Sequence, residues 1–386
     1  MKIEFGKKVI ETALAKTIKA ASVRSPLPIL SYVLIRTEKG GKVSFSTTDL
    51  EFGIECRVEA NILEEGSVCV PARIITDLVG QIMEDRVTLE YGGEGSLELT
   101  TVKSKYHINT RDVEEFPILP KPSDNMIFSM PQGTLKEMLR NVIIAVAGME
   151  EQRVALTGVH VTADESGVMT VSTDSRRLVK AVEPLDEPPS GEFSVIIPQR
   201  SIKEILGLLS EEETPVHFTL SEGQVFLSFD HTNIFSRIID GKFPNYEVVI
   251  PRSTDIKVLV ERARLQNAVK RALIMASDKD SPDLMRMEIS RDSLKLMANS
   301  VDMGDAYEEV SVQEFEGNPI ALAVNGKYFM EALNVMTDDF IWVLLNSPVM
   351  PVMLNSPRRD SYIYIVMPVR LRKDNIDTEA SVHSYS

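Results

Sequence analysis

The chain has 386 residues, of which 43% are hydrophobic, and a net charge of −15. This length suggests two or three domains, each with enough apolar residues to bury its own core. Its overall acidity, taken alone, argues against nucleic-acid binding, and no run of about 18 apolar residues exists that could span a membrane.

The N-terminal residues Met1–Phe5 lead straight into the first predicted helix, so we expect no signal peptide. Cys56 and Cys69 are the two cysteines of the chain. They could form a disulfide, but cytosolic disulfides are rare. We therefore expect two buried free thiols in a reducing cytoplasm.

One template occurs three times along the chain: an amphipathic helix, a hairpin-like run, a short helix, and further strands. Each amphipathic helix is predicted from apolar residues at helical spacing. A repeat this long is a whole domain, so the chain is predicted to be a tandem array of three similar domains. The apolar positions are Ile10, Leu14, Ile18 and Ala21, then Leu135, Leu139, Val142, Ile143 and Val146, then Leu265, Val269, Ala272, Leu273 and Ala276.

Alternating apolar and β-branched residues predict the strands between the helices. Glycine pairs at 40–41 and 92–93 predict the turns. Each unit is therefore predicted to be α+β, with two helices packed on one side of antiparallel sheet. The expected strands are Tyr32–Thr37, Lys42–Thr47, Phe52–Ala60, Val87–Tyr91 and Ser96–Thr101 in the first unit, and Val159–Ala163, Val168–Thr173, Val216–Leu220 and Val225–Phe229 in the second.

Landmarks at a constant offset fix the register of the repeats. The short helices are predicted to begin at Pro71, Pro198 and Asn325, and consecutive positions are 127 residues apart. We expect each proline just inside the helix start, where its missing N–H costs nothing. The predicted domains are 1–124, 125–253 and 254–371, followed by a polar tail, 372–386, that we expect to be disordered.

Positive charge is concentrated on the three long helices. Segments 7–24, 133–148 and 261–276 carry +4, +1 and +3, which leaves −23 on the rest of the chain. Helical geometry places Lys8, Lys16 and Lys19 opposite the apolar stripe. Solvated helix faces would explain one such helix, but three favour a functional basic surface. If the sheets continue between domains, a curved array would line its concave side with these helices, which suits the phosphate backbone of DNA.

Two other functions compete with DNA binding. An enzyme is disfavoured because the chain has neither a phosphate-binding Gly-x-x-x-x-Gly-Lys-Ser/Thr loop nor Cys/His metal spacing. Asp49 and Asp174 recur at matching strand ends, where an aspartate more often satisfies turn backbone than performs catalysis. The second alternative is a linear three-domain interaction scaffold, which predicts a monomer.

Four segments together resemble the bacterial DNA polymerase III β subunit family, the sliding clamps. The resemblance runs from Met1 to Leu371 and implies a non-enzymatic processivity factor without a cofactor. It further implies a head-to-tail homodimer that closes a six-domain ring around double-stranded DNA. The segments are Pro71-Ala72-Arg73, Thr173-Asp174-Ser175-Arg176-Arg177-Leu178, Phe243-Pro244-Asn245-Tyr246 and Tyr364-Ile365-Val366-Met367-Pro368-Val369-Arg370-Leu371.

The resemblance also implies where the ring touches DNA and where it closes. It places Arg24 on the inner wall. For closure it sets Tyr106 and Ile108, exposed on one face of an edge strand, against Ile274 and Met275 after the third long helix; a core position is the alternative for each. Helix position adds further DNA-binding candidates: Arg73, Lys136, Arg140, Arg200, Lys203, Lys270 and Arg271.

The family's partners dock a short linear peptide in a cleft between the second and third domains. The implied partners are the DNA polymerase III alpha subunit, the clamp loader, other polymerases and repair proteins. Methionine adapts to different side chains, and arginine can orient a carboxylate. The matching positions are Leu156, Thr173, Ser175, Arg176, Arg177, Leu178, Pro244, Val249, Met350, Pro351, Val366, Met367, Pro368, Val369, Arg370 and Leu371.

Three features qualify this cleft. Tyr362–Val369 is predicted to be a strand, so Val366 and Met367 could be plain core. Ser175-Arg176 stands where many relatives carry a Gly-His pair, so the charge at the cleft rim is expected to differ. The chain also continues for 15 residues past the Arg-Leu pair at which relatives usually stop, and we expect that tail to be a passive extension.

Overall fold

A computed structural model describes residues 1–22, 25–93, 95–123, 125–276, 283–300, 302–358 and 361–370. The expectations for Arg24, Leu371 and the tail 372–386 lie outside these residues. The chain forms two compact units. Unit 1 comprises Met1–Lys136, Thr162–Gly167 and Leu185–Ile239; unit 2 comprises Glu137–Val161, Val168–Pro184 and the chain from Asp240 onward.

Unit 1 contains two antiparallel sheets. The first has the order β5-β1-β7-β8-β9, with β1 (Lys2–Gly6), β5 (Asn61–Glu64), β7 (Arg86–Tyr91), β8 (Ser96–Thr100) and β9 (Lys105–Asn109). The second has the order β10-β15-β16-β17-β4-β3-β2-β6. Its strands are β2 (Tyr32–Glu38), β3 (Lys42–Thr48), β4 (Phe52–Glu59), β6 (Ser67–Pro71), β10 (Phe128–Pro131), β15 (Pro215–Ser221), β16 (Gln224–Phe229) and β17 (Thr232–Arg237).

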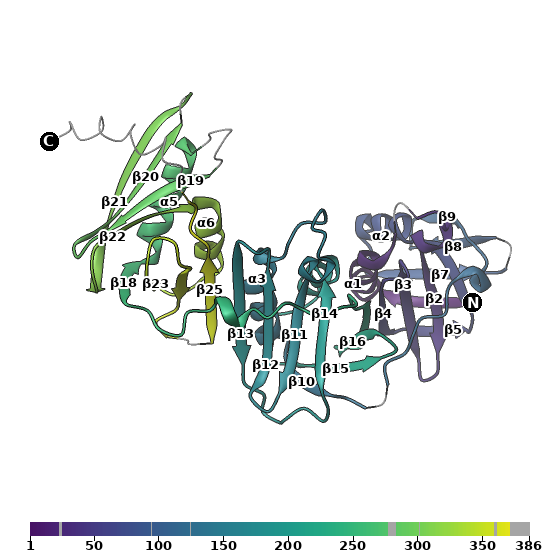
Figure 1. Cartoon of the computed structure of the whole chain (residues 1–386). Helices are drawn as coiled ribbons and strands as arrows, with labels where there is room; N and C mark the ends of the chain where they lie inside the picture. The colour runs from purple at the N-terminus through teal and green to yellow at the C-terminus, as the bar shows by residue number, and fades with distance from the viewer. Residues whose placement is uncertain are drawn as a thin grey trace. The chain divides into compact units, whose positions relative to one another are not determined.

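The helices of unit 1 pack against these sheets. They are α1 (Lys7–Thr17), continued by η1 (Ile18–Ala20), α2 (Ala72–Gln81) and α4 (Gln199–Leu206), with the short turns η2 (Pro28–Ser31) and η3 (Val113–Glu115). Figure 1 shows α1 and α2 side by side against the strands. Ile10 and Leu14 of α1 and Ile75 and Val79 of α2 are buried in one core with Phe5 and Phe45 of the sheets.

Unit 2 contains one long run of strands in the order β12-β13-β25-β24-β23-β18-β21-β20-β19-β22. The strands are β12 (Gly167–Thr173), β13 (Arg177–Glu183), β18 (Ile256–Glu261), β19 (Leu284–Ile289), β20 (Ser293–Ser300), β21 (Gly304–Glu316), β22 (Ile320–Asn325), β23 (Phe340–Leu345), β24 (Val352–Asn355) and β25 (Tyr362–Val366). The helices α5 (Arg262–Met275) and α6 (Gly326–Val335) contact each other, and η4 (Ile143–Ala145), η5 (Val154–Thr157) and η6 (Glu247–Val249) also belong to this unit.

The remaining elements belong to the middle repeat. The helix α3 (Gln132–Val142) and the strand β11 (Gly158–Asp164) are each divided between the units, and β14 (Phe193–Pro198) lies in unit 1. The units therefore do not follow the three repeats, because the middle repeat shares strands with a neighbour in each unit. The domain boundaries 1–124, 125–253 and 254–371 stay predictions.

The predicted long helices are confirmed as α1, α3 and α5, with one correction to the stripe of the first. Ile10 and Leu14 are buried, but Ile18 and Ala21 are only half-buried. The α-helix ends at Thr17 and tightens into η1, so Thr17 and Ala20 turn inward instead. The same change occurs in the second repeat, where Ile143 in η4 is half-buried and Ala145 is buried.

The short helices start one residue later than predicted. Pro71, Pro198 and Asn325 are the N-cap residues of α2, α4 and α6 rather than their first helical residues. Each is also the last residue of the preceding strand, so an extended backbone is kept up to the cap. Asn325 adds a side-chain cap, since its Oδ1 accepts the N–H of Tyr328 at 3.2 Å.

The predicted strands of the first and second repeats are confirmed, with ends that differ by one residue at most. The turn at 40–41 is also confirmed, because both glycines have positive φ, +78° and +74°. Glycine adopts these positive φ values easily because it has no Cβ, and the values match a tight hairpin turn. Sequence alternation and glycine pairs were sufficient for the local structure here.

Candidate functional site

Each unit contains a place where the sheet of one repeat continues into the next. In unit 1, β17 of the second repeat pairs antiparallel with β4 of the first. Thr232 lies opposite Cys56, and Ser236 lies opposite Phe52. We call this the first junction.

The second junction lies in unit 2, where β25 of the third repeat pairs with β13 of the second. Tyr362 lies opposite Ala181, and Val366 lies opposite Arg177. A shift of 125 residues along one strand and 130 along the other converts the first register into the second. The two junctions are therefore built alike, although their side chains differ.

A tight turn precedes the strand at each junction. At the second junction, Asp174 Oδ1 accepts the N–H groups of Arg176 and Arg177 at 2.9 and 3.0 Å. Ser175 between them has φ +73°, a left-handed conformation that side chains other than glycine rarely adopt. Arg153 Nη2 donates to Ser175 Oγ at 2.7 Å. Ser175 and Arg176 are thus held at the surface in a defined conformation.

The first junction has the same turn. Asp49 Oδ1 accepts the N–H groups of Glu51 and Phe52 at 3.0 and 2.8 Å, and Leu50 has φ +79°. The expectation that Asp49 and Asp174 satisfy turn backbone is confirmed. Each aspartate uses its other oxygen to hold an arginine: Asp49 pairs with Arg200 at 2.5 Å and Asp174 with Arg177 at 3.0 Å.

The guanidinium of Arg177 is engaged within the protein on three sides. Nε donates to Asp174, Nη1 pairs with Glu331 of α6, and the guanidinium carbon lies 4.3 Å from the ring centre of Tyr328. Tyr364 Oη in turn donates to the Tyr328 carbonyl at 2.9 Å. Arg177 therefore connects the turn to the third repeat, and its expected contact with a peptide stays a prediction.

The predicted cleft residues divide into a buried floor and an exposed rim. Leu156, Thr173, Leu178 and Val366 are buried. The exposed apolar side chains, between 37% and 44% accessible, are Val249, Met350, Met367 and Val369. Pro244, Ser175, Arg176 and Arg370 are exposed, and Pro351 and Pro368 are half-buried.

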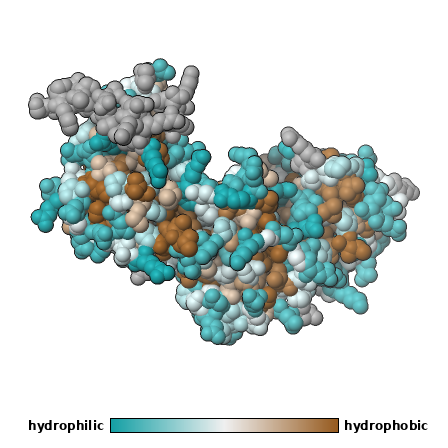
Figure 2. Space-filling view, in the orientation of Figure 1, coloured by the Kyte–Doolittle hydropathy of each residue, from teal (hydrophilic) through white to brown (hydrophobic). Residues whose placement is uncertain are grey.

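The end of β25 decides the roles of two neighbouring residues. The strand ends at Val366 rather than at Val369 as predicted. Val366 is core, whereas Met367 lies past the strand, with its N–H donated to the Arg176 carbonyl at 2.8 Å and its side chain exposed. The core alternative thus holds for Val366 but not for Met367. Figure 2 shows an apolar patch near this end of β25.

Sequence reasoning missed several residues next to the predicted cleft. Val154, Val248 and Val349 are more exposed than the predicted apolar residues beside them. The anchors Tyr328 and Glu331 were missed as well. The apolar residues gave no sequence signal because they lie in turns, where the sequence shows no periodic pattern. The anchors gave none because they are more than 150 residues from Arg177.

The predicted DNA-binding cations differ in how strongly they are engaged. Arg73 pairs with Asp77, Lys136 with Glu211, Arg200 with Asp49 and Arg271 with Glu308, at 3.6, 3.0, 2.5 and 2.6 Å. Arg140, Lys203 and Lys270 are exposed, and no ion pair joins them to another residue within the described part of the chain. Pairing with an acidic neighbour lowers the net charge that a cation offers to phosphate.

Two lysines, Lys16 of α1 and Lys19 of η1, are not on an outward basic face as predicted. Lys16 is half-buried, and its Nζ donates to Thr232 Oγ1 at the first junction at 3.3 Å. Lys19 is also half-buried, with Nζ so close to Gly207 that a Cβ there would lie 2.6 Å from it. Both lysines turn toward the second repeat, because β17 and α4 approach α1. Lys8 is exposed as predicted.

The predicted ring-closing residues also needed correction. Tyr106 and Ile108 lie on β9, an edge strand as expected, but only Tyr106 is exposed. Ile108 is 4% exposed and belongs to the core of unit 1, so the core alternative holds for it. Ile274 and Met275 lie in the last turn of α5 rather than after it; Ile274 is exposed and Met275 half-buried.

Cys56 and Cys69 are free and buried, as predicted. Burial raises the pKa of the Cys69 thiol to about 12. Among the described residues, no group of three or more His, Cys, Asp or Glu side chains could hold a metal ion. No described helix is long and apolar enough to cross a membrane.

Three α+β repeats whose sheets continue from one repeat into the next define the class of DNA clamps. Models of the DNA polymerase III beta subunit match the chain in three consecutive parts: the N-terminal domain over residues 1–120, the central domain over 129–245 and the C-terminal domain over 247–370. The chain belongs to the DNA polymerase III beta subunit family.

Individual relatives agree along nearly the whole chain. The beta sliding clamp of Synechococcus elongatus is 28% identical over 377 residues, which cover 96% of this chain and 100% of that protein. The sliding clamp structure from Bacillus subtilis has a TM-score of 0.91 and 25% identity, and the subunit beta structure from Pseudomonas aeruginosa has 0.90 and 27%. Both cover 96% of this chain and are covered completely.

Proposed function

We propose that two copies of this chain close head to tail into a ring around duplex DNA, and that partner peptides dock at the second junction. As a family member the protein is a DNA sliding clamp, a processivity factor without catalytic activity. A ring holds a polymerase on its template by topology, so it needs no base-specific contact.

The strand pairing of the two junctions supports closure by a second copy. In each junction the second strand of a hairpin pairs with the last strand of the next repeat's meander. The strand of the third repeat that corresponds to β4 and β13 is β21. The strand of the first repeat that corresponds to β17 and β25 is β9. β9 is the last strand of its sheet, and no described strand pairs with the outer edge of 304–310 in β21. Open strand edges are templates for pairing with another chain.

A third junction between chains would use these two open edges. β21 offers Asp305 and Glu309, and the flank of β9 offers Lys103. Glu308, Lys105 and Arg111 also lie at these edges but would contribute less, because each is already paired within the chain. Such charge complementarity sets register and steers association. Tyr106 on β9 and Ile274 on α5 would contribute apolar contact area, in line with the pairing that the sequence suggests. A contact of this type is heterologous, and with three domains per chain two copies close the ring.

Contact with DNA is assigned to exposed cations of the helices. Arg140, Lys203 and Lys270 carry this proposal, since they are exposed and have no described ion-pair partner. Arg73, Lys136, Arg200 and Arg271 would contribute less because each is already paired. Arg24 is included from the family resemblance alone. Few and weak phosphate contacts suit a ring that must slide.

Peptide docking is assigned to the exposed apolar rim of the second junction. Val249, Met350, Met367 and Val369 are partly exposed beside a buried floor that includes Leu156 and Leu178. Such a patch fits the alternate side chains of a short peptide. Arg176 and Arg370 at the rim would favour peptides with acidic flanks. The proposed partners are the polymerase alpha subunit, the clamp loader, other polymerases and repair proteins.

We place the protein in the cytoplasm. Both cysteines are unpaired, and the raised pKa of the Cys69 thiol keeps it protonated and unreactive at neutral pH. Free buried thiols suit a reducing compartment.

Loading onto DNA of different topology tests the ring directly. Clamp assembled on nicked circular DNA should be retained through gel filtration and lost when the circle is cut once. Equal retention on circular and linear DNA would contradict encirclement. The molar mass by sedimentation should be that of two chains of 43.1 kDa. A persistent monomer would favour the scaffold alternative.

Site-directed changes test closure and docking separately. Tyr106→Asp with Ile274→Asp should give a monomer that still binds peptide, whereas Ile118→Asp, at a more exposed apolar position, should leave the dimer intact. Deletion of 367–386 should abolish binding of a polymerase-derived peptide while the dimer survives. Unchanged peptide binding would contradict the docking assignment.

A further inference from the structure

The strand pairings inside the chain specify how the open edges of β9 and β21 would meet, so this inference rests on the ring closure proposed above. A residue shortly after the last strand of each repeat makes the same hydrogen bond. Its N–H donates to the strand before the short helix, at 3.0, 2.8 and 2.8 Å in the three repeats. The donors and acceptors are Arg111 and Cys69, Ile239 and Ile196, and Val369 and Ala323.

This shared hydrogen bond aligns the last strands with one another. Lys105 on β9 lies six residues before Arg111, and Asn233 on β17 lies six residues before Ile239. Lys105 is therefore the equivalent of Asn233. At the first junction the residue opposite Asn233 is Glu55 of β4.

The equivalent of Glu55 on β21 follows from the sheets of the two repeats. The pairings lead from the strand before the short helix to the strand at the junction by the same three steps in each repeat. The path runs through Cys69, Leu34, Ser46 and Glu55 in the first repeat, and through Ala323, Arg286, Met297 and Tyr307 in the third. Tyr307 is thus the equivalent of Glu55.

These equivalences define the register of the third junction. Lys105 lies opposite Tyr307 of the partner subunit. Because the strands are antiparallel, two residues further along β9 place His107 opposite Asp305 of the partner subunit. Side chains alternate along a strand, so His107 and Asp305 lie on one face of the sheet. The other face carries the buried Ile108 and Val310.

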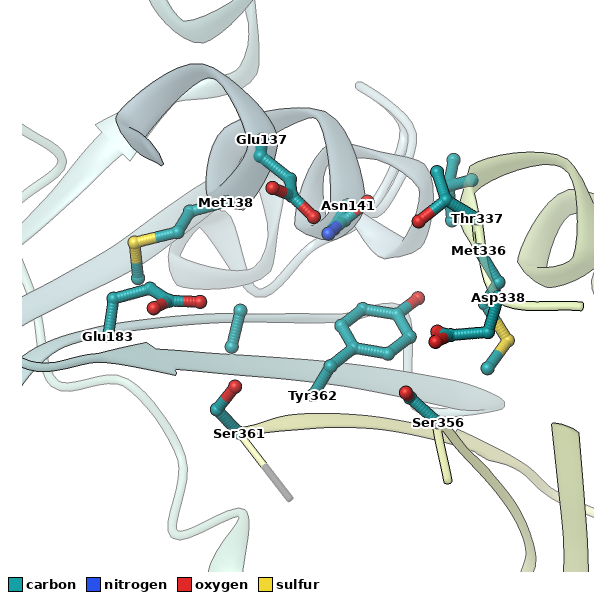
Figure 3. Close-up of a pocket in the computed structure, with 12 residues that line it drawn as sticks. Glu137, Met138, Asn141, Glu183, Met336, Thr337, Asp338, Ser356, Ser361 and Tyr362 are labelled. Atoms are coloured by element: carbon teal, nitrogen blue, oxygen red, sulfur yellow. The ribbon is translucent and has the colours of Figure 1, made fainter. Parts of the chain in front are cut away.

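That other face is the helix side of the junction. Figure 3 shows it at the second junction, where Asn141 of α3 and Tyr362 of β25 line one pocket. The equivalent positions at the third junction are Arg271, which like Asn141 is the tenth residue of its helix, and Ser104 before β9. Arg271 already pairs with Glu308 at 2.6 Å. The helix side thus carries an ion pair that is complete within one subunit.

His107 and Asp305 are different, because each is available for a partner. Both residues are exposed in the single chain. No ion pair or hydrogen bond joins either side chain to another residue in the described part of the chain. An imidazole and a carboxylate on opposed residues of neighbouring strands can interact directly.

The junctions within the chain have no ionisable group at this position. Gly53 lies opposite Phe235 at the first junction, and Leu178 lies opposite Ile365 at the second. All four residues are buried. These junctions are permanent because the chain connects their repeats, whereas the junction between subunits has to open before a DNA circle can enter. An ionisable pair there affects only the junction that opens.

The other charged groups around this pair do not change charge near neutral pH. Glu98 of β8 lies opposite His107, but it already pairs with Lys105 at 2.6 Å. The strand β6, which also contacts β9, has no charged side chain. Only histidine ordinarily titrates between pH 5 and 8. The remaining charged or ionisable neighbours are Lys103 and, across the junction, the partner's Tyr307, the partner's Glu309 and the partner's Lys295.

We infer that His107 and Asp305 of the partner subunit form an ion pair across the third junction, and that acidification thereby tightens ring closure. A histidine side chain gains its proton below about pH 6.5, where a carboxylate is still ionised. A nearby opposite charge favours the protonated form. The pair therefore contributes fully below that pH, and its contribution is lost as the pH rises toward 8.

Sedimentation of the full chain over a range of concentrations tests the pH dependence. The dissociation constant of the dimer should be about fivefold lower near pH 6 than near pH 8, because two equivalent junctions each gain a solvent-exposed ion pair. His107→Gln and Asp305→Asn should each remove this difference. His231→Asn is the matched control: that histidine is also exposed, and asparagine tolerates its φ of +59°. A pH-independent wild type, or a dependence that persists in both His107→Gln and Asp305→Asn, would overturn the inference.

Cross-linking tests the register separately. Hydrogen-bonded opposed residues of antiparallel strands have Cα atoms about 5.5 Å apart, which a disulfide can span, whereas diagonal neighbours are about 7–8 Å apart. His107→Cys combined with Asp305→Cys should therefore give a covalent dimer when an oxidant is added, while the buried Cys56 and Cys69 stay free. His107→Cys with Met303→Cys, and with Tyr307→Cys, are the matched controls for registers displaced by two residues.

The outcomes separate this inference from the ring itself. Cross-linking in a control instead, or in none of the three variants while sedimentation shows a dimer, would overturn the inference and leave the ring intact. A persistent monomer of the wild-type chain would overturn the proposed ring and this inference with it.

Discussion

The two junctions share one backbone arrangement but expose different side chains. Arg237 at the first junction and Met367 at the second occupy equivalent positions, and each donates its N–H at 2.8 Å to the carbonyl of the residue just before the opposite strand. Arg237 pairs with Glu51 at 3.1 Å and is solvated, whereas Met367 presents an exposed apolar side chain. The same hydrogen-bonded strand end can therefore present a polar or an apolar surface, depending on one side chain, and the apolar one is where we propose that peptides dock.

The buried side chains of the junctions differ in the opposite way: they are apolar at the first junction and include a charge at the second. Phe52 is buried at the first junction, and Gly53 beside it makes room for the Phe235 ring. The equivalent of Phe52 at the second junction is Arg177, which is held by Glu331 and Tyr328. An apolar interior stabilises the first junction, whereas the second depends on a buried charge that only its complete set of partners can satisfy.

The largest expected effect is at Arg177. Arg177→Ala leaves Glu331 and Asp174 without their partner, so the free energy of unfolding should fall by about 3 kcal/mol. Urea denaturation measures it. The matched variant Arg237→Ala breaks an exposed pair at the first junction and should cost less than about 1 kcal/mol. Equal losses would show that the buried network contributes no more than the exposed pair.

The next effect is expected at Gly53. In Gly53→Ala the added Cβ would overlap Cε1 of Phe235, a core ring that can move little. We expect a loss of about 2 kcal/mol in the free energy of unfolding. Gly80→Ala in α2 is the control, since its Cβ meets nothing within 4 Å and should stabilise the helix slightly. An unchanged stability in Gly53→Ala would mean that β4 and β17 separate easily.

An exchange of side chains between the junctions tests docking. Met367→Arg makes the second junction resemble the first and should weaken binding of a polymerase-derived peptide about tenfold, through lost apolar contact. Fluorescence anisotropy with the labelled peptide measures this. The reciprocal variant Arg237→Met should leave that affinity unchanged. A loss in both variants would indicate a general defect rather than a docking contact.

The smallest effects are expected at the left-handed turn residues. Leu50→Gly relieves the strain of a φ of +79° and should raise stability by about 1 kcal/mol. Ser175→Gly relieves similar strain but loses the hydrogen bond from Arg153, so its gain should be about half as large. Thermal unfolding of the two variants compares them directly. A larger gain for Ser175→Gly would mean that the Arg153 contact adds no stability.

The sequence by itself determined the local structure and its repetition. Helical spacing located α1, α3 and α5, alternation located strands such as β3 and β12, and the constant offset of Pro71, Pro198 and Asn325 established the repeats. These features depend on neighbouring residues in the chain, so their physical causes are visible in the sequence. The expectation that Asp174 satisfies turn backbone is also confirmed, whereas the role of the Thr173–Leu178 motif in a peptide cleft stays a prediction.

Only the tertiary structure decided which side chains are available. Lys16 and Lys19 were expected to face outward, but β17 and α4 lie against α1 and draw them inward. Ile108 was expected to be exposed, but the core of unit 1 closes over it. Arg177 pairs with Glu331, which lies 154 positions further along the chain. Exposure, ion pairing and cavities arise where distant segments meet, because strand pairing between repeats sets those contacts and no local pattern encodes them.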